Sequence, residues 1–232
     1  MDSRKPAYHG YRFPPEIISH TLWLYYRFSL SFRDVEDLLA KRGIVVSYET
    51  IRQWCEKFGS GYAARLKKRQ GRLGDTWHLD EVFITIRGQR HYLWRAVDQD
   101  GDVIDILVQR RRNGRAAKRF FRKLLKGQGS EPRRLVTDKL RSYRVAHRTV
   151  MPSVVHDTDQ YANNRAEVSH QPTRQRERQM RRFKSWAQAQ RFLSVHGVIQ
   201  NLFRVGRHLL HAANARLLRA RAFGDWEEAA CV

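Results

Sequence analysis

The chain has 232 residues, and its 45 Lys and Arg residues outnumber its 23 Asp and Glu residues, which gives a formal net charge of +22. A hydrophobic content of 41% is enough for a buried core and excludes a disordered chain, while two cysteines far apart in the sequence exclude a disulfide framework. No run of about 20 apolar residues is present, so the sequence predicts no membrane-spanning helix and a cytoplasmic location. The excess of basic residues favours a polyanionic partner over a merely solubilising surface.

The first regular segments along the chain have helical periodicity. They follow an N-terminal arm, 1–13, and fall into three stretches, of which the last spans 48–58. Ser31 and Ser47 stand where they can cap the second and third helices. Two short helices across a tight turn predict a helix-turn-helix DNA-binding domain over 14–60.

The third predicted helix leaves polar side chains outside its buried stripe. Arg52 and Gln53 are suited to paired hydrogen bonds with base edges, and Lys57 is suited to a phosphate. Any three-helix bundle has an exposed polar face, so this pattern alone leaves DNA binding open, and the net charge favours it. We therefore predict that these three residues contact DNA.

The pattern then changes from helices to strands. A basic segment with little apolar periodicity, 61–74, predicts a linker. Beyond it, alternating residues and turn signals predict three strands, at 76–86, 91–97 and 103–108. Helices and strands then alternate: a helix at 113–126, a strand at 133–137, a helix at 140–147 and a strand at 153–156. Long helices are predicted after Asn163. This order is typical of the α/β ribonuclease H-like fold, so we predict a mixed five-stranded sheet with flanking helices over 75–212 and a C-terminal tail over 213–232.

Three acidic residues occupy positions that call for a chemical explanation. Asp80 interrupts an apolar strand, Asp138 ends another strand, and Glu167 opens a helix. Right-handed crossovers place the second of these strands beside the first, so the two aspartates can meet. Carboxylate oxygens suit Mg²⁺ or Mn²⁺, and a pair of such ions can both activate a nucleophile and stabilise a leaving oxyanion. We predict two ions per site, with Asp80 bridging both and Asp138 and Glu167 each holding one.

Each acid also has a structural alternative. An aspartate after a strand is commonly a helix cap or a turn residue. Glu167 has rivals in Asp157 and Asp159, which fall in a predicted loop, and in Glu177, for which an ion pair with a neighbouring arginine is the simpler explanation. Glu81 is expected on the opposite sheet face from Asp80, where it either supports the site from behind or has a structural role.

A dense basic segment, 171–184, follows Glu167. It offers only Glu177 as a counter-acid, which disfavours a merely solvated helix face and predicts a DNA track. The residues that we predict to bind DNA here are Arg174, Arg178, Arg181, Arg182 and Lys184.

Four motifs together resemble a known family. They are Trp77-His78-Leu79-Asp80-Glu81, Tyr92-Leu93-Trp94-Arg95-Ala96-Val97-Asp98, Val136-Thr137-Asp138-Lys139, and Asn163-Asn164-Arg165-Ala166-Glu167 followed by Ser169-His170-Gln171. The chain is similar to DDE-type transposases of bacterial insertion sequences, specifically the insertion-sequence-six family, and through them to the catalytic core of retroviral integrases.

This resemblance implies a magnesium-dependent DNA transposase of the bacterial cytoplasm, associated with the nucleoid. It implies binding of terminal inverted repeats and target DNA, nicking to a 3′-hydroxyl, strand transfer, and a homodimer or larger synaptic assembly. Asp80, Asp138 and Glu167 match the family's three acids. Arg174 matches a basic residue often found seven positions beyond the glutamate, although Pro172 should kink or restart the helix between them.

Two other functions stay open from the sequence. One is a non-enzymatic helix-turn-helix DNA-binding regulator whose second domain only oligomerises. The other is a ribonuclease H-like nuclease or resolvase that shares the metals but lacks strand transfer.

Overall fold

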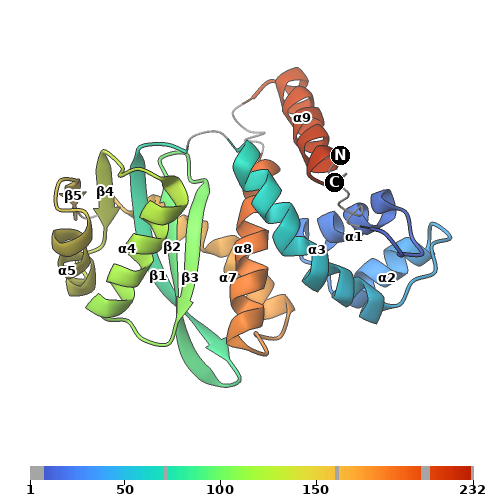
Figure 1. Cartoon of the computed structure of the whole chain (residues 1–232), viewed down its shortest axis with the longest axis horizontal. Helices are drawn as coiled ribbons and strands as arrows, with labels where there is room; N and C mark the ends of the chain where they lie inside the picture. Colours follow the sequence, from blue (N-terminus) through green and yellow to red (C-terminus); the bar gives the residue numbers. More distant parts are fainter. Residues whose placement is uncertain (1–7, 71–72, 160–161, 205–209, 231–232) are drawn as a thin grey trace. The chain divides into compact units, whose positions relative to one another are not determined.

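The computed structural model describes residues 8–70, 73–159, 162–204 and 210–230, and Figure 1 shows its elements. The chain divides into two compact units. We call residues 72–197 the sheet unit, and residues 1–71 together with 198–232 the helical unit.

The sheet unit contains one five-stranded mixed sheet in the order β3-β2-β1-β4-β5. Strands β1, β2 and β3 are antiparallel, whereas β4 runs parallel to β1 and β5 runs parallel to β4. This meander followed by parallel strands is the ribonuclease H-like fold, which confirms the predicted fold class. The elements are β1 (Thr76–Ile86), β2 (Gln89–Asp98), β3 (Val103–Gln109), α4 (Gly114–Gln128), β4 (Arg134–Thr137), α5 (Arg141–Val150), β5 (Val155–Asp157), α6 (Asn164–Ser169), α7 (Gln171–Gln179) and α8 (Trp186–Leu202), which continues into the helical unit.

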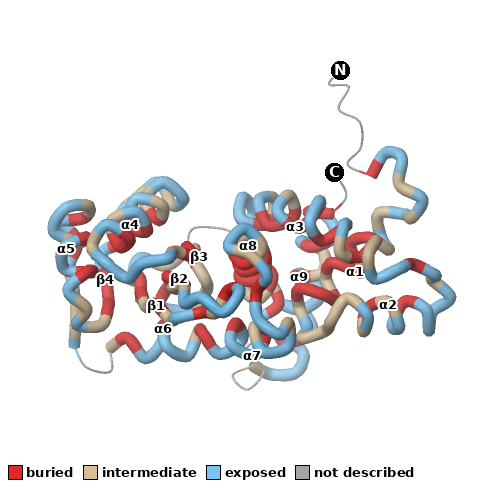
Figure 2. The backbone as a smooth tube through the Cα atoms, turned by 90° about the horizontal axis from the view of Figure 1, so that it is seen from below, coloured by how far each residue is buried: buried red, intermediate tan, exposed pale blue. Residues whose placement is uncertain are grey.

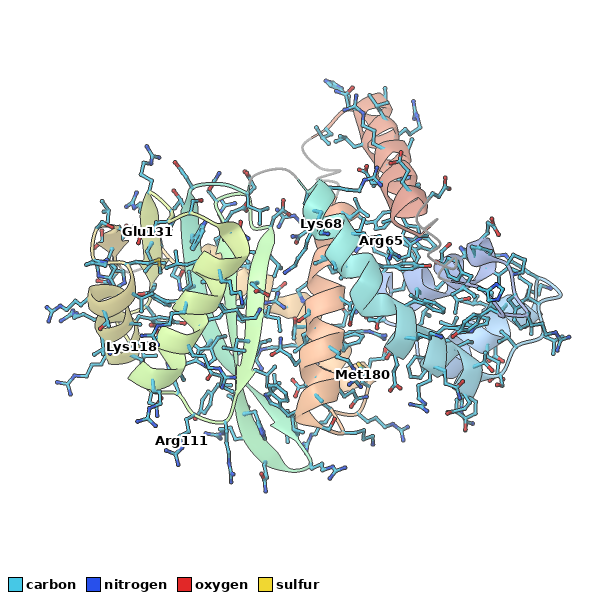
Figure 3. All side chains as sticks on the ribbon, in the orientation of Figure 1. Arg65, Lys68, Arg111, Lys118, Glu131 and Met180 are labelled. Atoms are coloured by element: carbon cyan, nitrogen blue, oxygen red, sulfur yellow. The ribbon has the colours of Figure 1, made fainter. Side chains whose placement is uncertain are left out.

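Both faces of this sheet are covered. Figure 2 shows the sheet between α4 on one side and α6 on the other. Trp94 of β2 is fully buried and packs against Phe120 of α4 and Tyr143 of α5. Figure 3 shows the side chains of the described residues, among them the labelled Arg111, just before α4, and Lys118, which is on α4. The apolar stripe of α4 thus supplies the core, and its basic residues lie outside it.

Strand β1 extends well beyond its parallel neighbour. β4 pairs with β1 only from Thr76 to Leu79, while β2 pairs with β1 as far as Ile86. A two-residue turn at Arg87 and Gly88 closes the β1–β2 hairpin, and both residues have positive φ, as a type I′ turn requires. The edge of β1 from Asp80 onward is therefore free of β4 and can form a site.

The helical unit begins with α1 (Pro15–Arg27), α2 (Phe32–Ala40) and α3 (Tyr48–Arg69). The two predicted serine caps are present, because the Ser31 hydroxyl accepts a hydrogen bond from the Asp34 amide and the Ser47 hydroxyl accepts one from the Thr50 amide. Residues 41–47 connect α2 and α3, a longer connection than the turn of three or four residues usual in this motif. None of the helices within the described residues combines the length and the apolar character needed to span a bilayer.

The predicted linker over 61–74 needs correction, because α3 continues to Arg69. Its buried stripe extends through Tyr62 and Leu66, beyond the point where two glycines suggest a break. Gly59 is needed within the helix, since a Cβ there would lie 2.8 Å from the hydroxyl oxygen of Tyr26 on α1. The glycine permits close helix packing and does not end the helix.

The predicted C-terminal tail over 213–232 also needs correction. Residues Ala212–Ala230 form helix α9, which packs against α1 and α3 within the helical unit. Trp226 of α9 is buried beside Tyr62, with ring centroids 5.2 Å apart. The apolar side chains of α9 pack against the C-terminal half of α3, which the sequence had predicted to be a linker.

Candidate metal-binding catalytic site

Two of the predicted acids meet because of the parallel pairing of β1 with β4. Leu79 pairs with Thr137, so Asp80 and Asp138 follow side by side where β4 ends. Within the described residues, Asp80, Glu81 and Asp138 each offer a carboxylate oxygen, and these three atoms lie within 4.8 Å of one another. An all-oxygen set of this size fits a hard divalent cation such as Mg²⁺ or Mn²⁺.

Asp138 combines a structural contact with an open position. Its carboxylate accepts a hydrogen bond from the Leu140 amide at 3.0 Å, just before α5 begins, and its side chain is 39% exposed. Partial burial, assisted by the nearby negative charge of Asp80, raises the pKa of Asp138. Two carboxylates that oppose each other's ionisation form a site that a cation would stabilise.

Glu81 was predicted either to support the site from behind Asp80 or to be structural, and its side chain is fully buried. Arg112 donates a hydrogen bond from Nε to Glu81 at 2.5 Å, and Arg112 Nη2 lies 3.7 Å from an oxygen of Asp138. Burial raises the pKa of Glu81 to about 7, although the nearby Tyr143 hydroxyl and the charge of Arg112 oppose this rise. Strand alternation predicted Glu81 on the opposite sheet face, and only the structure shows that its carboxylate lies within 4.8 Å of those of the two aspartates.

The raised pKa of Glu81 gives a pH-dependent prediction. Between pH 4.5, its ordinary pKa, and pH 7 the folded chain binds this proton more tightly than the unfolded chain, so the contribution to stability is lost as pH rises. In Glu81→Gln this loss is absent, and we expect the variant to gain about 2 kcal/mol of unfolding free energy relative to wild type between pH 5 and pH 8. Urea unfolding in EDTA at several pH values measures the difference.

A matched control is Glu131→Gln, which changes an exposed acid. Its difference from wild type should be the same at every pH. A difference for Glu81→Gln that is equally independent of pH would contradict the assignment.

Glu167 lies on α6, which is tied to β1 beside Asp80. Asn163 donates a hydrogen bond from Nδ2 to the Leu79 carbonyl at 2.7 Å, and His170 Nε2 lies 3.3 Å from Asp80 Oδ2. Asn163, Glu167 and His170 follow the spacing i, i+4, i+7, which places them on one helix face. The Glu167 side chain is exposed and stands outside the cluster of three carboxylates.

The junction of α6 and α7 is as Pro172 predicted. α6 ends at Ser169 and α7 restarts at Gln171, with the proline in its first turn. Arg174 lies one turn further along, and its guanidinium carbon is 5.6 Å from the centroid of the Phe83 ring on β1.

Arg95 was not singled out from the sequence, yet it holds this junction in place. It is buried and pairs with Asp80 in the β1–β2 register. Its guanidinium donates to the Ser169 carbonyl at 2.5 Å and to the Thr173 hydroxyl, and burial lowers its pKa to about 10. A charged residue within the apolar run 93–97 was the signal, of the same kind as the one that identified Asp80.

The rival acids have other partners. Asp157 forms an ion pair with Arg134, and its pKa is lowered mainly by a backbone hydrogen bond from Asp159. Glu177 accepts a hydrogen bond from the Thr85 amide at 2.9 Å, so the ion pair with a neighbouring arginine that we predicted is not needed to explain it.

The predicted DNA track is basic and open. Arg174, Arg178, Arg181 and Arg182 line one pocket. Lys184 is exposed, and its carbonyl accepts a hydrogen bond from Arg87 Nε at 2.7 Å.

On α3, Gln53 and Lys57 are exposed. Arg52 forms ion pairs with Glu49 at 2.6 Å and Glu56 at 2.9 Å, and these partners raise its pKa. Any contact of Arg52 with DNA therefore has to compete with two carboxylates on the same helix.

A carboxylate cluster at the end of β4 in a ribonuclease H-like sheet fits the class of the polynucleotidyl transferases, and the comparisons with known proteins agree with that class. A family model described as a DDE domain matches residues 74–206. The chain therefore belongs to the DDE transposases of bacterial insertion sequences.

Two curated relatives come from Staphylococcus aureus. The transposase for insertion sequence-like element IS431mec, from strain Mu50, is 30% identical over 164 residues, which are 68% of this chain and 73% of the relative. The transposase for insertion sequence element IS257 in transposon Tn4003 matches with the same identity and coverage.

Among solved structures, the HTLV-2 integrase catalytic core domain in complex with magnesium is similar, with a TM-score of 0.43 and 12% identity over 59% of this chain and 92% of that chain. The strand order of the sheet defines the fold by itself.

Proposed function

We propose that the chain is a DNA transposase that nicks the ends of an insertion sequence and joins them to target DNA. One observation carries the proposal: Asp80 and Asp138 lie side by side where β4 ends, and the helix that carries Glu167 is tied to the same point of β1. Asp80, Asp138 and Glu167 would together hold two divalent ions, Mg²⁺ or Mn²⁺. The ions, when bound, would activate the attacking oxygen and stabilise the leaving oxygen.

The reaction proposed has two displacements at phosphorus. In the first, water attacks a phosphodiester at the end of the element, the bond from phosphorus to O3′ breaks, and a free 3′-hydroxyl results. In the second, that hydroxyl attacks a target phosphodiester, a new bond to phosphorus forms, and the target strand is released with its own 3′-hydroxyl. Neither displacement needs a nucleotide cofactor.

The chain's own residues position these reactants. Arg95 and His170 hold α6 and α7 against the sheet, and this would keep Glu167 within reach of ions bound by the two aspartates. Arg174, Arg178, Arg181, Arg182 and Lys184 would bind the DNA backbone through charge. Arg52, Gln53 and Lys57 on α3 would contact the terminal inverted repeats. Two ends must be paired, so a homodimer or larger synaptic assembly is proposed.

Product analysis tests this proposal. Labelled DNA that carries an end of the element is incubated with the chain, target plasmid and Mg²⁺, and the products are separated on denaturing gels. We expect nicked ends and labelled strands joined to target, both absent with EDTA. Cuts without joining would indicate a nuclease, and binding alone, unchanged by EDTA, would indicate a regulator.

A further inference from the structure

An aromatic side chain is exposed on β1, the strand that carries Asp80. Phe83 of β1 is 49% exposed, whereas Trp77 and Leu79, on the same face of the strand, belong to the buried core. Phe83 is three residues beyond Asp80, a distance of about 10 Å along a strand. The site already described does not use this ring.

Basic side chains surround the ring. The guanidinium carbons of Arg90 and Arg174 lie 4.9 Å and 5.6 Å from its centroid. Phe83 and Thr85 also line a pocket of about 540 Å³ with Glu177 and the arginines Arg174, Arg178, Arg181 and Arg182. A hollow of this size can hold a planar ring and its attached phosphate.

The only acid that lines this pocket within the described chain is already engaged. Glu177 accepts a hydrogen bond from the Thr85 amide on the free edge of β1. This contact fixes α7 to β1 and leaves the pocket with a strongly positive lining, which is the environment that an anion requires.

The backbone is unusual where α7 ends. Arg181 and Arg182 have φ angles of 50° and 72°, a left-handed conformation that costs energy for residues other than glycine. The Arg182 amide donates to the Glu177 carbonyl at 2.9 Å, which stabilises this reversal of the chain. Together with the bond from the Arg181 amide to the Arg178 carbonyl at 3.0 Å, this forms the Schellman motif that ends many helices, and here it places both arginine side chains in the lining of the pocket.

We propose that this pocket binds an unpaired nucleotide of single-stranded DNA, with its base stacked on Phe83 and its phosphate held by the arginines. This inference rests on the proposed function, because it assigns the unpaired nucleotide to the DNA end at the carboxylates. A base within a duplex has its faces covered by neighbours, so only an unpaired base can stack on the ring. Stacking tolerates any base, and the base would take the place of a guanidinium group that lies over the ring.

The test is a binding measurement in EDTA, which makes it independent of catalysis. Fluorescence anisotropy gives the affinity of the full chain for a blunt duplex and for the same duplex with a short single-stranded overhang. A third duplex has an overhang of abasic sugars, which keeps the phosphates and removes the bases. We expect wild type to prefer the normal overhang about ten-fold over both other substrates.

Two substitutions separate stacking from charge and from folding. Phe83→Leu keeps an apolar side chain but removes the aromatic face, so it should lose the ten-fold preference while blunt-duplex affinity stays within about two-fold. Phe83→Trp should keep the preference. Because half of the side chain is exposed, both variants should fold, which circular dichroism checks.

Preference for the overhang that survives in Phe83→Leu, or an abasic overhang that binds as well as the normal one, would overturn the inference. So would equal wild-type affinity for blunt and overhanging DNA. The proposed function fails separately, through an absence of Mg²⁺-dependent cutting and joining, which this measurement does not involve.

Discussion

Asp80→Asn and Asp138→Asn are each expected to reduce end nicking by at least about 10³-fold in Mg²⁺. Each substitution replaces a charged oxygen ligand by a neutral amide of nearly the same shape, so the loss reflects metal binding and not packing. A bound metal ion contributes several kcal/mol to stabilising the transition state, and about 1.4 kcal/mol corresponds to a factor of ten. Single-turnover rates on labelled end DNA measure the effect, and anisotropy should show DNA affinity within a few-fold of wild type.

A matched control is Asp159→Asn, which alters an exposed acid outside the cluster. It should nick at the wild-type rate. Glu167→Gln is the informative third variant, because Glu167 stands outside the three-carboxylate cluster although α6 is tied to Asp80. The proposed function requires a loss comparable to that of Asp80→Asn, and wild-type nicking by Glu167→Gln would remove Glu167 from the metal site.

Arg95→Met is expected to release the junction of α6 and α7 from the sheet. The substitution keeps the length of the side chain but removes its hydrogen bonds to the Ser169 carbonyl and the Thr173 hydroxyl, both in the segment packed on β1. Hydrogen bonds from a charged donor contribute about 1.5–3 kcal/mol each, so we expect the local opening free energy to fall by about 3 kcal/mol. Amide hydrogen exchange in α6 and α7 should then be about 10²-fold faster, and nicking should fall because Glu167 is no longer held.

The control for this prediction is Arg90→Met, which removes an exposed arginine from the same strand. Exchange in α6 and α7 should be unchanged in that variant. If Arg95→Met also leaves this exchange unchanged, Arg95 does not hold the junction.

The fold could be predicted because its signals are local. Alternation in the three meander strands, the apolar stripe of α4 and the serine caps of α2 and α3 each depend on residues close in sequence. The meeting of Asp80 and Asp138 also followed, because crossover handedness leaves few arrangements for parallel strands.

Contacts that depend on tertiary packing could not be predicted in the same way. Gly59 suggested the end of a helix, and only the position of Tyr26 shows why α3 continues through it. The hydrogen bonds from Arg95 to α6 and α7 depend on where these helices meet the sheet. The contact of His170 with Asp80 depends on the same position. Sequence spacing between Asp138 and Glu167 does not determine that position.

Metal-dependent rescue of Asp80→Cys tests the central claim most directly, because it asks whether the side chain at this position contacts the ion. A thiolate is a poor ligand for Mg²⁺ and a better one for the softer Mn²⁺. The account predicts that Asp80→Cys is inactive in Mg²⁺ and regains nicking in Mn²⁺, while Asp80→Asn stays inactive in both. Equal nicking by Asp80→Cys in the two metals, at the wild-type rate, would contradict it.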